Sequence, residues 1–458
     1  MLRFLLGLFL LFGVFDSSIA FGAKLVPKST IDRGKSLTEK FTLSNGIPVI
    51  YRQIDNSDIL QINYNFHYGL VNQEHEEKLL PDALFGTMPS AAKGWEKSKV
   101  FRTLEKYSAA VACSSGIETS ACKMTTINEY WDELLPLFAA VIKSPSLNKE
   151  DVELQKKRTI AEAQRSRQES SRYVNDVVNR VYYPAKHPYR LSLDDKKSQA
   201  SRLTTEKLRA LHNKILNSNL HHIVVVGSIG KGKLQETLEK SFGKIKGKKK
   251  SNVVIKQPNF NKQKAISEEN REIPTAYLRL KMNMPGVKEQ DYIASRIMMK
   301  ILDDELSEEI RTRRSLSYSV FSFIIGYEIG IGVIGVSTSK PKETLEAIHE
   351  VISKVKKQTF SREKIDEFLT LYATEYFLTL EEHSSLASSL SNYFHYFGNT
   401  DVLYELPQHL RQVSAADIKR VANKYLVNFR AGIVFDKKKF ESKWIESFIG
   451  SNLGKRSS

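Results

Sequence analysis

Apolar and polar side chains alternate between residues 59 and 68, and this pattern is typical of a half-buried strand. Leu60, Ile62, Tyr64 and Phe66 share one face, because successive side chains of a strand point to opposite sides. Related patterns predict the other elements of the first half of the chain. These are two strands joined by an Asn-Gly turn within 40–51, a strand at 222–227, and helices at 130–142, 149–178, 204–216 and 233–242.

The second half of the chain repeats this plan. Shifted by 210 residues, segment 203–216 overlies 413–426 with its apolar positions matched, and the same shift places 223–225 on 433–435. The elements predicted here are a strand at 276–284, a helix at 290–310, strands at 318–325 and 329–337, and further helices. We therefore predict an α+β fold with two similar halves of about 210 residues, each a mainly antiparallel sheet packed with helices.

The first residues of the chain have the features of a secretory signal at 1–20. Arg3 precedes an apolar run at 4–15, and Ser18-Ile19-Ala20 supplies the small residues of a cleavage site. The apolar run of about twelve residues is shorter than the roughly 20 that span a bilayer. We expect an exported protein without a transmembrane anchor, periplasmic if the source is a bacterium.

The stretch 244–270 is basic and polar, and it is the best candidate for a linker. The first half then occupies residues 36–243 and the second half residues 271–447. The chain has 69 Lys and Arg against 52 Asp and Glu, a net charge of +17, which suits nucleic acid, an anionic membrane surface or an acidic partner. Because the basic residues are scattered outside 244–250 and no nucleic-acid motif is present, we do not expect nucleic-acid binding.

Two cysteines, Cys113 and Cys122, flank a segment that reads as the turn of a hairpin. In an oxidising compartment they could form a cross-strand disulfide, and two buried thiols are the alternative. Both interpretations remain open from the sequence. Two thiols alone do not make a metal site.

The segment 306–320 reads as the end of an amphipathic helix, a turn and the start of a strand. Arg311 would project from the last helical turn, and Tyr318 would open the strand. A guanidinium fork and a phenolic hydroxyl in one cleft suit the binding of a peptide carbonyl. A purely structural interpretation also holds, because the helix dipole favours Arg near a C-terminus and Tyr is common in strands.

The duplicated halves, the exported chain and the segment Arg311…Tyr318 together resemble the pitrilysin/insulinase family of zinc metallopeptidases. The similarity is to its short bacterial members and to the mitochondrial processing peptidase subunits, and it implies a clam-shell fold. Further matching pieces are Leu79-Leu80 through Phe85-Gly86-Thr87, the helix at 156–167, His187-Pro188-Tyr189, the strand at 222–227 and Ser241-Phe242-Gly243.

Catalysis in that family needs the zinc motif H-x-x-E-H on a helix, and this chain lacks it. The resemblance places the expected His, Glu and His near Glu77, Leu80 and Pro81, and leucine and proline cannot bind zinc. Glu162 could occupy the position of the third ligand, but one carboxylate does not hold zinc, and it also reads as a solvated helix residue. We read the ten histidines as structural, and we expect no metal or other cofactor in this chain.

By the same resemblance, Arg311 would hold a substrate carbonyl and Tyr318 would donate to the oxyanion of the tetrahedral intermediate, with Ser315 where glycine is usual. The leading hypothesis is a non-catalytic, substrate-binding subunit of an exported heteromeric zinc metallopeptidase, inactive alone. Its partners would be a zinc-bearing homologous subunit and a peptide substrate. The alternative is a non-enzymatic scaffold or peptide-binding protein that retains only the fold. A third option is an independent hydrolase whose site is not recognisable.

Overall fold

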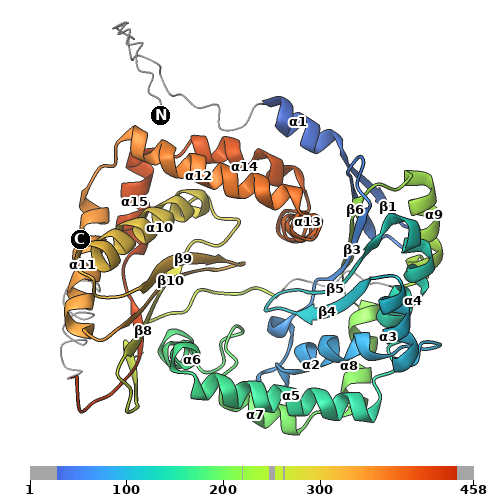
Figure 1. Cartoon of the computed structure of the whole chain (residues 1–458), viewed down its shortest axis with the longest axis horizontal. Helices are drawn as coiled ribbons and strands as arrows, with labels where there is room; N and C mark the ends of the chain where they lie inside the picture. The colour runs from blue at the N-terminus through green and yellow to red at the C-terminus, as the bar shows by residue number, and fades with distance from the viewer. Residues whose placement is uncertain (1–27, 219, 247–252, 261–263, 441–458) are drawn as a thin grey trace, which may run out of the picture.

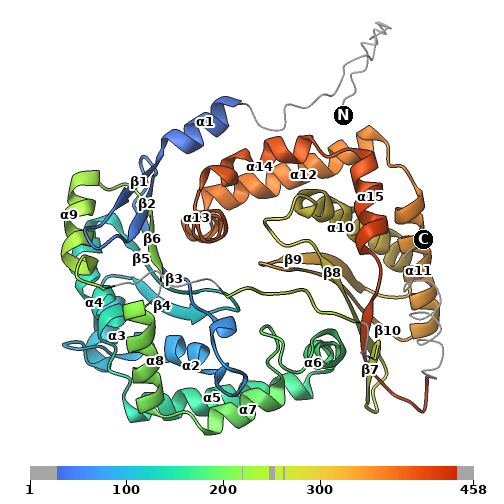
Figure 2. The ribbon, with the colours of Figure 1, turned by 180° about the vertical axis from the view of Figure 1, so that it is seen from behind.

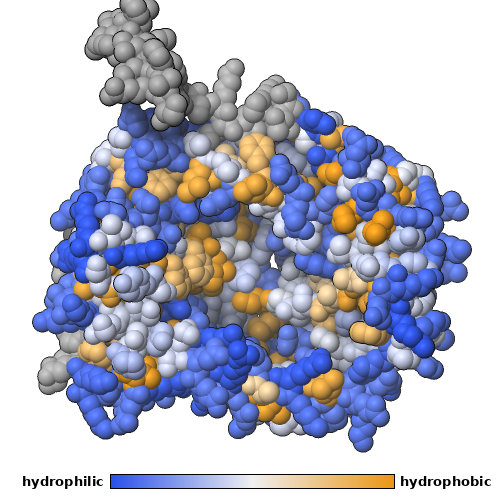
Figure 3. All heavy atoms as spheres, viewed as in Figure 1, coloured by the Kyte–Doolittle hydropathy of each residue, from blue (hydrophilic) through white to orange (hydrophobic). Residues whose placement is uncertain are grey.

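The computed structural model describes residues 28–218, 220–246, 253–260 and 264–440. It has two β-sheets with helices around them, arranged in a ring (Figure 1). The space-filling view shows a hollow in the middle of this face, with apolar side chains at several points around it (Figure 3). The predicted signal at 1–20 lies outside the described residues. In the described part of the chain, no helix combines the length and apolar character that a membrane crossing requires.

The two sheets repeat one topology, which confirms the predicted duplication. The first has the order β1-β2-β6-β3-β5-β4 and the second the order β7-β11-β8-β10-β9. In each sheet one pair is parallel, β2 with β6 and β7 with β11, and the other pairs are antiparallel. The strands are β1 (Thr38–Thr42), β2 (Pro48–Gln53), β3 (Ile59–Phe66), β4 (Ala110–Ser115), β5 (Ser120–Ile127), β6 (His221–Gly227), β7 (Ile266–Asn270), β8 (Ala276–Met284), β9 (Ser319–Gly326), β10 (Gly330–Thr338) and β11 (Arg430–Phe435).

Fifteen α-helices occur in the described residues. They are α1 (Lys28–Ser36), α2 (Leu80–Thr87), α3 (Lys97–Lys106), α4 (Trp131–Lys143), α5 (Lys149–Gln168), α6 (Ser170–Tyr182), α7 (Leu193–Ser201), α8 (Thr205–Ser218), α9 (Lys231–Phe242), α10 (Tyr292–Leu306), α11 (Pro341–Lys357), α12 (Arg362–Glu381), α13 (His383–Phe397), α14 (Asp401–Arg411) and α15 (Ala415–Tyr425). Helices α2, α4, α8 and α9 pack on one face of the first sheet. Helices α10, α11 and α15 pack on one face of the second.

The other face of each sheet is covered by a helix from the opposite half of the chain. Helix α6 contacts β8 and β11 of the second sheet, and α13 contacts β3 and β6 of the first (Figures 1 and 2). Leu386 and Leu390 of α13 share a core with Val224 and Val226 of β6. Burying a side chain of this size is worth about 1.5–3 kcal/mol, so the exchanged helices hold the two halves together.

The predicted helix at 149–178 is wrong as one element, because it is divided between α5 and α6. Glu169 between them is extended, with φ −78° and ψ 105°. The guanidinium of Arg271 donates to the backbone carbonyl oxygens of Arg167 and Gln168, which satisfies acceptors that the end of α5 leaves unpaired. The break lets the apolar stripe of α6 turn onto the second sheet.

Part of the segment predicted as a linker, 244–270, is a strand in the structure. Residues 266–270 form β7, the edge strand that runs parallel to β11. Gln257 donates to the carbonyl oxygen of Met284 at 2.6 Å, so residues before β7 lie along the second sheet. The segment around Gln257 and strand β7 are both polar. Their contacts with the sheet therefore fix their structure more than an apolar pattern of their own does. Residues 247–252 and 261–263 lie outside the described part.

A cluster of three histidines lies where α13 meets the first sheet. Nε2 of His67 is 2.8 Å from Nδ1 of His222, and Nδ1 of His395 is 3.3 Å from Nδ1 of His67. Burial lowers the pKa of His67 to about 3 and that of His395 to about 4, and neighbouring His395 and Lys288 add smaller effects in the same direction. Burial also places the pKa of His222 well below its usual value. These imidazoles are therefore neutral at pH 7.

The hairpin of β4 and β5 brings the two cysteines together. Cys113 lies directly opposite Cys122, with their Cα atoms 4.0 Å apart and their sulfur atoms joined. Of the two possibilities that the sequence leaves open, the structure contains the disulfide.

We predict that acid weakens the contact between the halves. In the folded state the pKa values of the clustered histidines lie below the ordinary value near 6.5, so the unfolded state binds more protons as pH falls from about 6.5 towards 4. Each histidine of the cluster that stays neutral in the folded state then lowers the free energy of unfolding by up to about 1.4 kcal/mol per pH unit. Urea unfolding at pH 7 and pH 5 should show a loss of several kcal/mol.

The matched variants for this test are His395→Gln, which removes one histidine of the cluster, and His409→Gln, which removes an exposed histidine outside it. The pH dependence should be shallower in His395→Gln and unchanged in His409→Gln. Equal slopes in all three proteins would contradict the role of the cluster.

We also predict that the two cysteines of the purified protein are oxidised. The denatured, unreduced protein should show no thiol that reacts with a colorimetric disulfide reagent. Because the bridge closes a short loop, replacing both Cys113 and Cys122 by serine should lower the free energy of unfolding by about 2–3 kcal/mol. Two reactive thiols per chain would mean that the pair is reduced.

Candidate functional site

The segment between α10 and β9 carries the two site residues predicted from the sequence. Helix α10 continues beyond its predicted end into a wider, π-helical turn, η5 (Ser307–Arg313). The N–H of Arg314 donates to the carbonyl oxygen of Glu309, five residues earlier, at 3.1 Å. Wide turns of this type occur often at functional sites. The strand predicted to start at Tyr318 begins at Ser319.

The turn that follows η5 is clamped by hydrogen bonds. The N–H of Leu316 donates to the carbonyl oxygen of Ile310 at 2.8 Å, and Ile310 and Leu316 are both buried. The hydroxyl of Ser317 donates to the carbonyl oxygen of Ser337 at 2.6 Å, and that of Thr338 to Leu316 at 2.8 Å. These bonds fix the backbone on both sides of the turn to β10.

Arg311 and Tyr318 lie at the two ends of this clamped turn, and both are exposed. Tyr318 is 94% exposed, which is the highest value among the large exposed apolar or aromatic side chains of the described residues. Within the described part of the chain neither side chain has a hydrogen bond or an ion pair. Neither one lines any of three cavities of about 280, 460 and 530 Å³ in the described residues, so none of these cavities encloses the pair.

The other arginines of the segment are engaged. Arg313 pairs with Glu308 at 3.2 Å and with Glu309 at 3.6 Å. Arg314 pairs with Glu309 at 2.7 Å and also with Glu350. Of the three described arginines of this turn, only Arg311 has a guanidinium group without a carboxylate, so it remains free to bind another partner.

The positions where the zinc motif was expected do not suit a metal. Leu80 and Pro81 are buried at the start of α2, and Glu77 lies 3.5 Å from Nζ of Lys207. The adjacent Lys78 is buried, donates to the carbonyl oxygens of His187 and Arg190, and has its pKa lowered by burial to about 8.

Glu162, which the resemblance places at the third ligand position, lies on α5 and accepts a hydrogen bond from Arg172 at 2.8 Å. It lines a cavity of about 280 Å³ together with Asp82, Arg158 and Lys196. Within the ranges that the structure describes, no group of three or more His, Cys, Asp or Glu side chains could hold a metal ion. The residues present therefore do not fit a zinc site, and we assign no chemical step to a metal in this chain.

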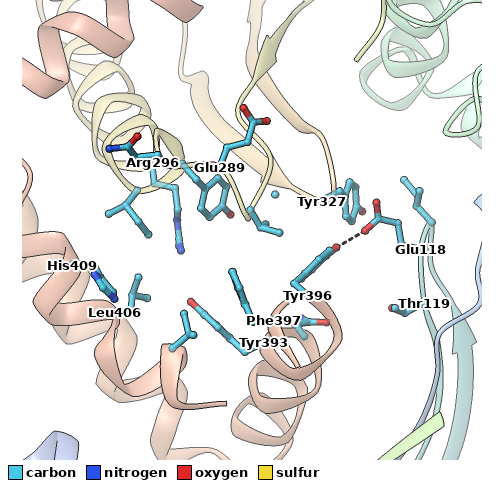
Figure 4. A pocket seen from close by; sticks show the side chains of 18 of the residues that line it. Glu118, Thr119, Glu289, Arg296, Tyr327, Tyr393, Tyr396, Phe397, Leu406 and His409 are labelled. Atoms are coloured by element: carbon cyan, nitrogen blue, oxygen red, sulfur yellow. Dashed lines mark hydrogen bonds between the residues drawn. The ribbon is translucent and has the colours of Figure 1, made fainter. Parts of the chain in front are cut away.

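The structure also contains a cavity of about 460 Å³ that the sequence analysis missed. It lies between the tips of the β4–β5 and β9–β10 hairpins and helices α10, α13 and α14 (Figure 4). Arg296 and Glu118 are among its charged residues. Because five separate segments form this cavity, no local motif in the sequence indicates it.

Ser315 has a positive φ of 48°, at the position where the family resemblance implies glycine. We predict that Ser315→Gly raises the free energy of unfolding by up to about 1 kcal/mol, because a left-handed backbone has a steric cost for serine and none for glycine. The control is Ser307→Gly, whose φ of −63° gives glycine no such advantage, and which should destabilise. Urea unfolding of both variants measures the two effects. A loss of stability in Ser315→Gly would contradict the prediction.

Comparisons with known proteins agree with this fold. Residues 88–193 match the family model "Insulinase (Peptidase family M16)", and residues 202–371 match the model "Peptidase M16 inactive domain". No curated sequence is similar enough to count as a match.

Solved structures share the fold at low sequence identity. A peptidase M16 inactive domain from Pseudomonas fluorescens has a TM-score of 0.78 at 17% identity, covering 87% of this chain and 98% of that one. A protease from Helicobacter pylori has a TM-score of 0.74 at 16% identity, covering 87% of this chain and 99% of that one. The periplasmic protease PqqL from Escherichia coli has 0.75 at 16%, covering 87% of this chain and 45% of that one. The chain therefore belongs to the insulinase family of peptidases, family M16, with an inactive-type peptidase fold.

Proposed function

We propose that this protein is the non-catalytic, substrate-binding subunit of an exported heteromeric zinc metallopeptidase that degrades or processes peptides. It would supply Arg311 and Tyr318 to an active site shared with a zinc-bearing homologous subunit. The observation that carries this proposal is the presence of two exposed donor side chains, Arg311 and Tyr318, at the ends of the clamped turn. Two strong hydrogen-bond donors stand exposed at its ends with no partner among the described residues, while Arg313 and Arg314 between them are paired with carboxylates.

The geometry of the turn suits transition-state binding. Hydrogen bonds from Leu316, Ser317 and Thr338 hold its backbone, so less conformational entropy remains to be lost when a substrate binds. A guanidinium presents several N–H donors in a rigid fork to a peptide carbonyl, and a phenol presents one O–H to a developing oxyanion. Such donors gain strength when a partner surface excludes water from them.

The second part of the active site would come from another chain. By the resemblance, Leu80 and Pro81 take the places of the base and of a metal ligand, and neither can bind zinc or accept a proton. The match to an M16 inactive domain supports a subunit that takes part in catalysis only when it is assembled with a catalytic chain. Export is supported by the features of residues 1–20, and the fold neighbour PqqL is described as periplasmic.

Two sheet edges offer further binding for an extended peptide. In the described residues β4 ends the first sheet and β9 ends the second. An exposed edge strand can bind a peptide by adding it to the sheet through backbone hydrogen bonds. Phe321 and Phe323 stack on β9 with ring centroids 5.8 Å apart, and Phe323 is 44% exposed. This edge could therefore also serve the alternative function, a non-enzymatic peptide-binding scaffold.

The test uses the complex of this chain with the zinc-bearing M16 subunit that the proposal requires, assayed with a quenched fluorescent peptide. We predict that Arg311→Ala and Tyr318→Phe each lower kcat by about 10²–10³, since each removes a donor to the transition state. Arg313→Ala is the control on the same turn and should change kcat little. Size-exclusion chromatography of each variant checks that the complex still assembles.

Two results would overturn the proposal. Wild-type turnover in both Arg311→Ala and Tyr318→Phe complexes would exclude the shared site, and loss of assembly alone would favour the scaffold. Strong zinc-dependent cleavage by the pure chain would show a complete active site in this protein.

A further inference from the structure

The cavity of about 460 Å³ between the two halves has a mostly apolar and aromatic wall. Its volume is within the range of ordinary small-molecule sites. Much of the apolar part of the wall comes from α10, α13, α14 and the segment before α10. Its members there include Val287, Ile293, Tyr393, Phe397, Val402 and Leu406.

One side of this cavity carries an arginine that has no carboxylate partner in the described part of the chain. The guanidinium of Arg296 points into the cavity, on the side where the hydroxyl of Tyr393 lies (Figure 4). It stacks over the ring of Tyr372, with 4.6 Å to the ring centroid, and forms no ion pair with any carboxylate of the described residues. Lys300, one turn later on the same helix, lies 3.7 Å from Glu375. Of these two cations of α10, only the one that faces the cavity lacks a carboxylate partner within the described residues.

The acidic residues of the cavity do not neutralise Arg296. Glu118 lies on the opposite side and accepts hydrogen bonds from the hydroxyls of Tyr189 and Tyr396 and from the N–H of Glu328 (Figure 4). Glu289 accepts a hydrogen bond from the N–H of Gly286 at 2.8 Å. Both carboxylates thus have donors of their own, and the positive charge of Arg296 remains unbalanced on its side.

We propose that this cavity binds an apolar molecule that carries one carboxylate. The carboxylate would be held by the guanidinium of Arg296 and the hydroxyl of Tyr393, because a guanidinium fork matches a carboxylate in two parallel hydrogen bonds. The apolar part would lie against Phe397, Val402 and Leu406. This chemistry belongs equally to the C-terminal residue of a peptide and to a free apolar acid. The proposal does not rest on the shared peptidase site.

The test is isothermal titration calorimetry of the full exported chain with three probes. N-acetyl-phenylalanine represents a peptide C-terminus, its amide lacks the charge, and decanoate represents a free apolar acid. We expect at least one of the acids to bind, and N-acetyl-phenylalaninamide to bind at least about tenfold more weakly than the matching acid, as the loss of a charged hydrogen-bonded pair implies. Tighter binding of one acid over the other identifies the source of the ligand.

Three variants make the test specific. Arg296→Gln should lower the affinity for the acid to that for the amide, whereas Lys300→Gln, which removes a positive charge from the same helix outside the cavity, should leave it unchanged. Val402→Phe adds bulk to a half-buried wall position and should block the acid without touching the charge. Thermal unfolding confirms that each variant is folded. Absence of binding by both acids, or equal binding of acid and amide, would overturn the proposal, as would acid binding that survives both Arg296→Gln and Val402→Phe.

Discussion

The structure depends on the mutual exchange of two helices. Helix α6 of the first half covers the second sheet, and α13 of the second half covers the first sheet. Neither sheet can bury both of its faces with helices of its own half alone. The contact of α6 with β11 is so close that a Cβ added to Gly432 would lie 2.4 Å from the backbone nitrogen of Val178. The two halves therefore form one packing unit, even though their topology shows that they are copies.

Much of this fold could be predicted from the sequence. The alternation at 59–68 and the matched apolar positions at a shift of 210 residues led to the strands, the duplication and the α+β class, because these patterns are local or internal to the chain. The exchange could not be predicted in this way. The end of α5 is stabilised by Arg271, about a hundred residues later, so no periodicity in 149–178 reveals the break at Glu169. The polar strand β7 was missed because its structure comes from pairing with β11.

The candidate sites show the same division. Arg311 and Tyr318 belong to one short segment, so their spacing could be recognised before the structure was known. The sequence could not show that Arg311 is unpaired in the described residues while its neighbours are paired. The ion pair of Arg314 joins it to Glu350 on another helix, so it depends on the fold. The common cleft predicted for Arg311 and Tyr318 is also not among the cavities of about 280, 460 and 530 Å³ in the described residues. The cavity around Arg296 had no sequence signal, because its wall combines five segments from both halves.

The two proposed sites are linked by one rigid element and yet are electrostatically separate. Arg296 lies in the second turn of α10, and Arg311 follows in the π-helical turn that continues this helix. Fifteen residues of helix correspond to about 22 Å, well beyond the Debye length of about 8 Å at physiological ionic strength. Removing the charge at one position therefore has little direct effect on the other. Any influence of a molecule in the cavity on the clamped turn would have to pass through the packing of α10, whose residues Met298, Ile301 and Leu302 are buried in the core that joins the two halves.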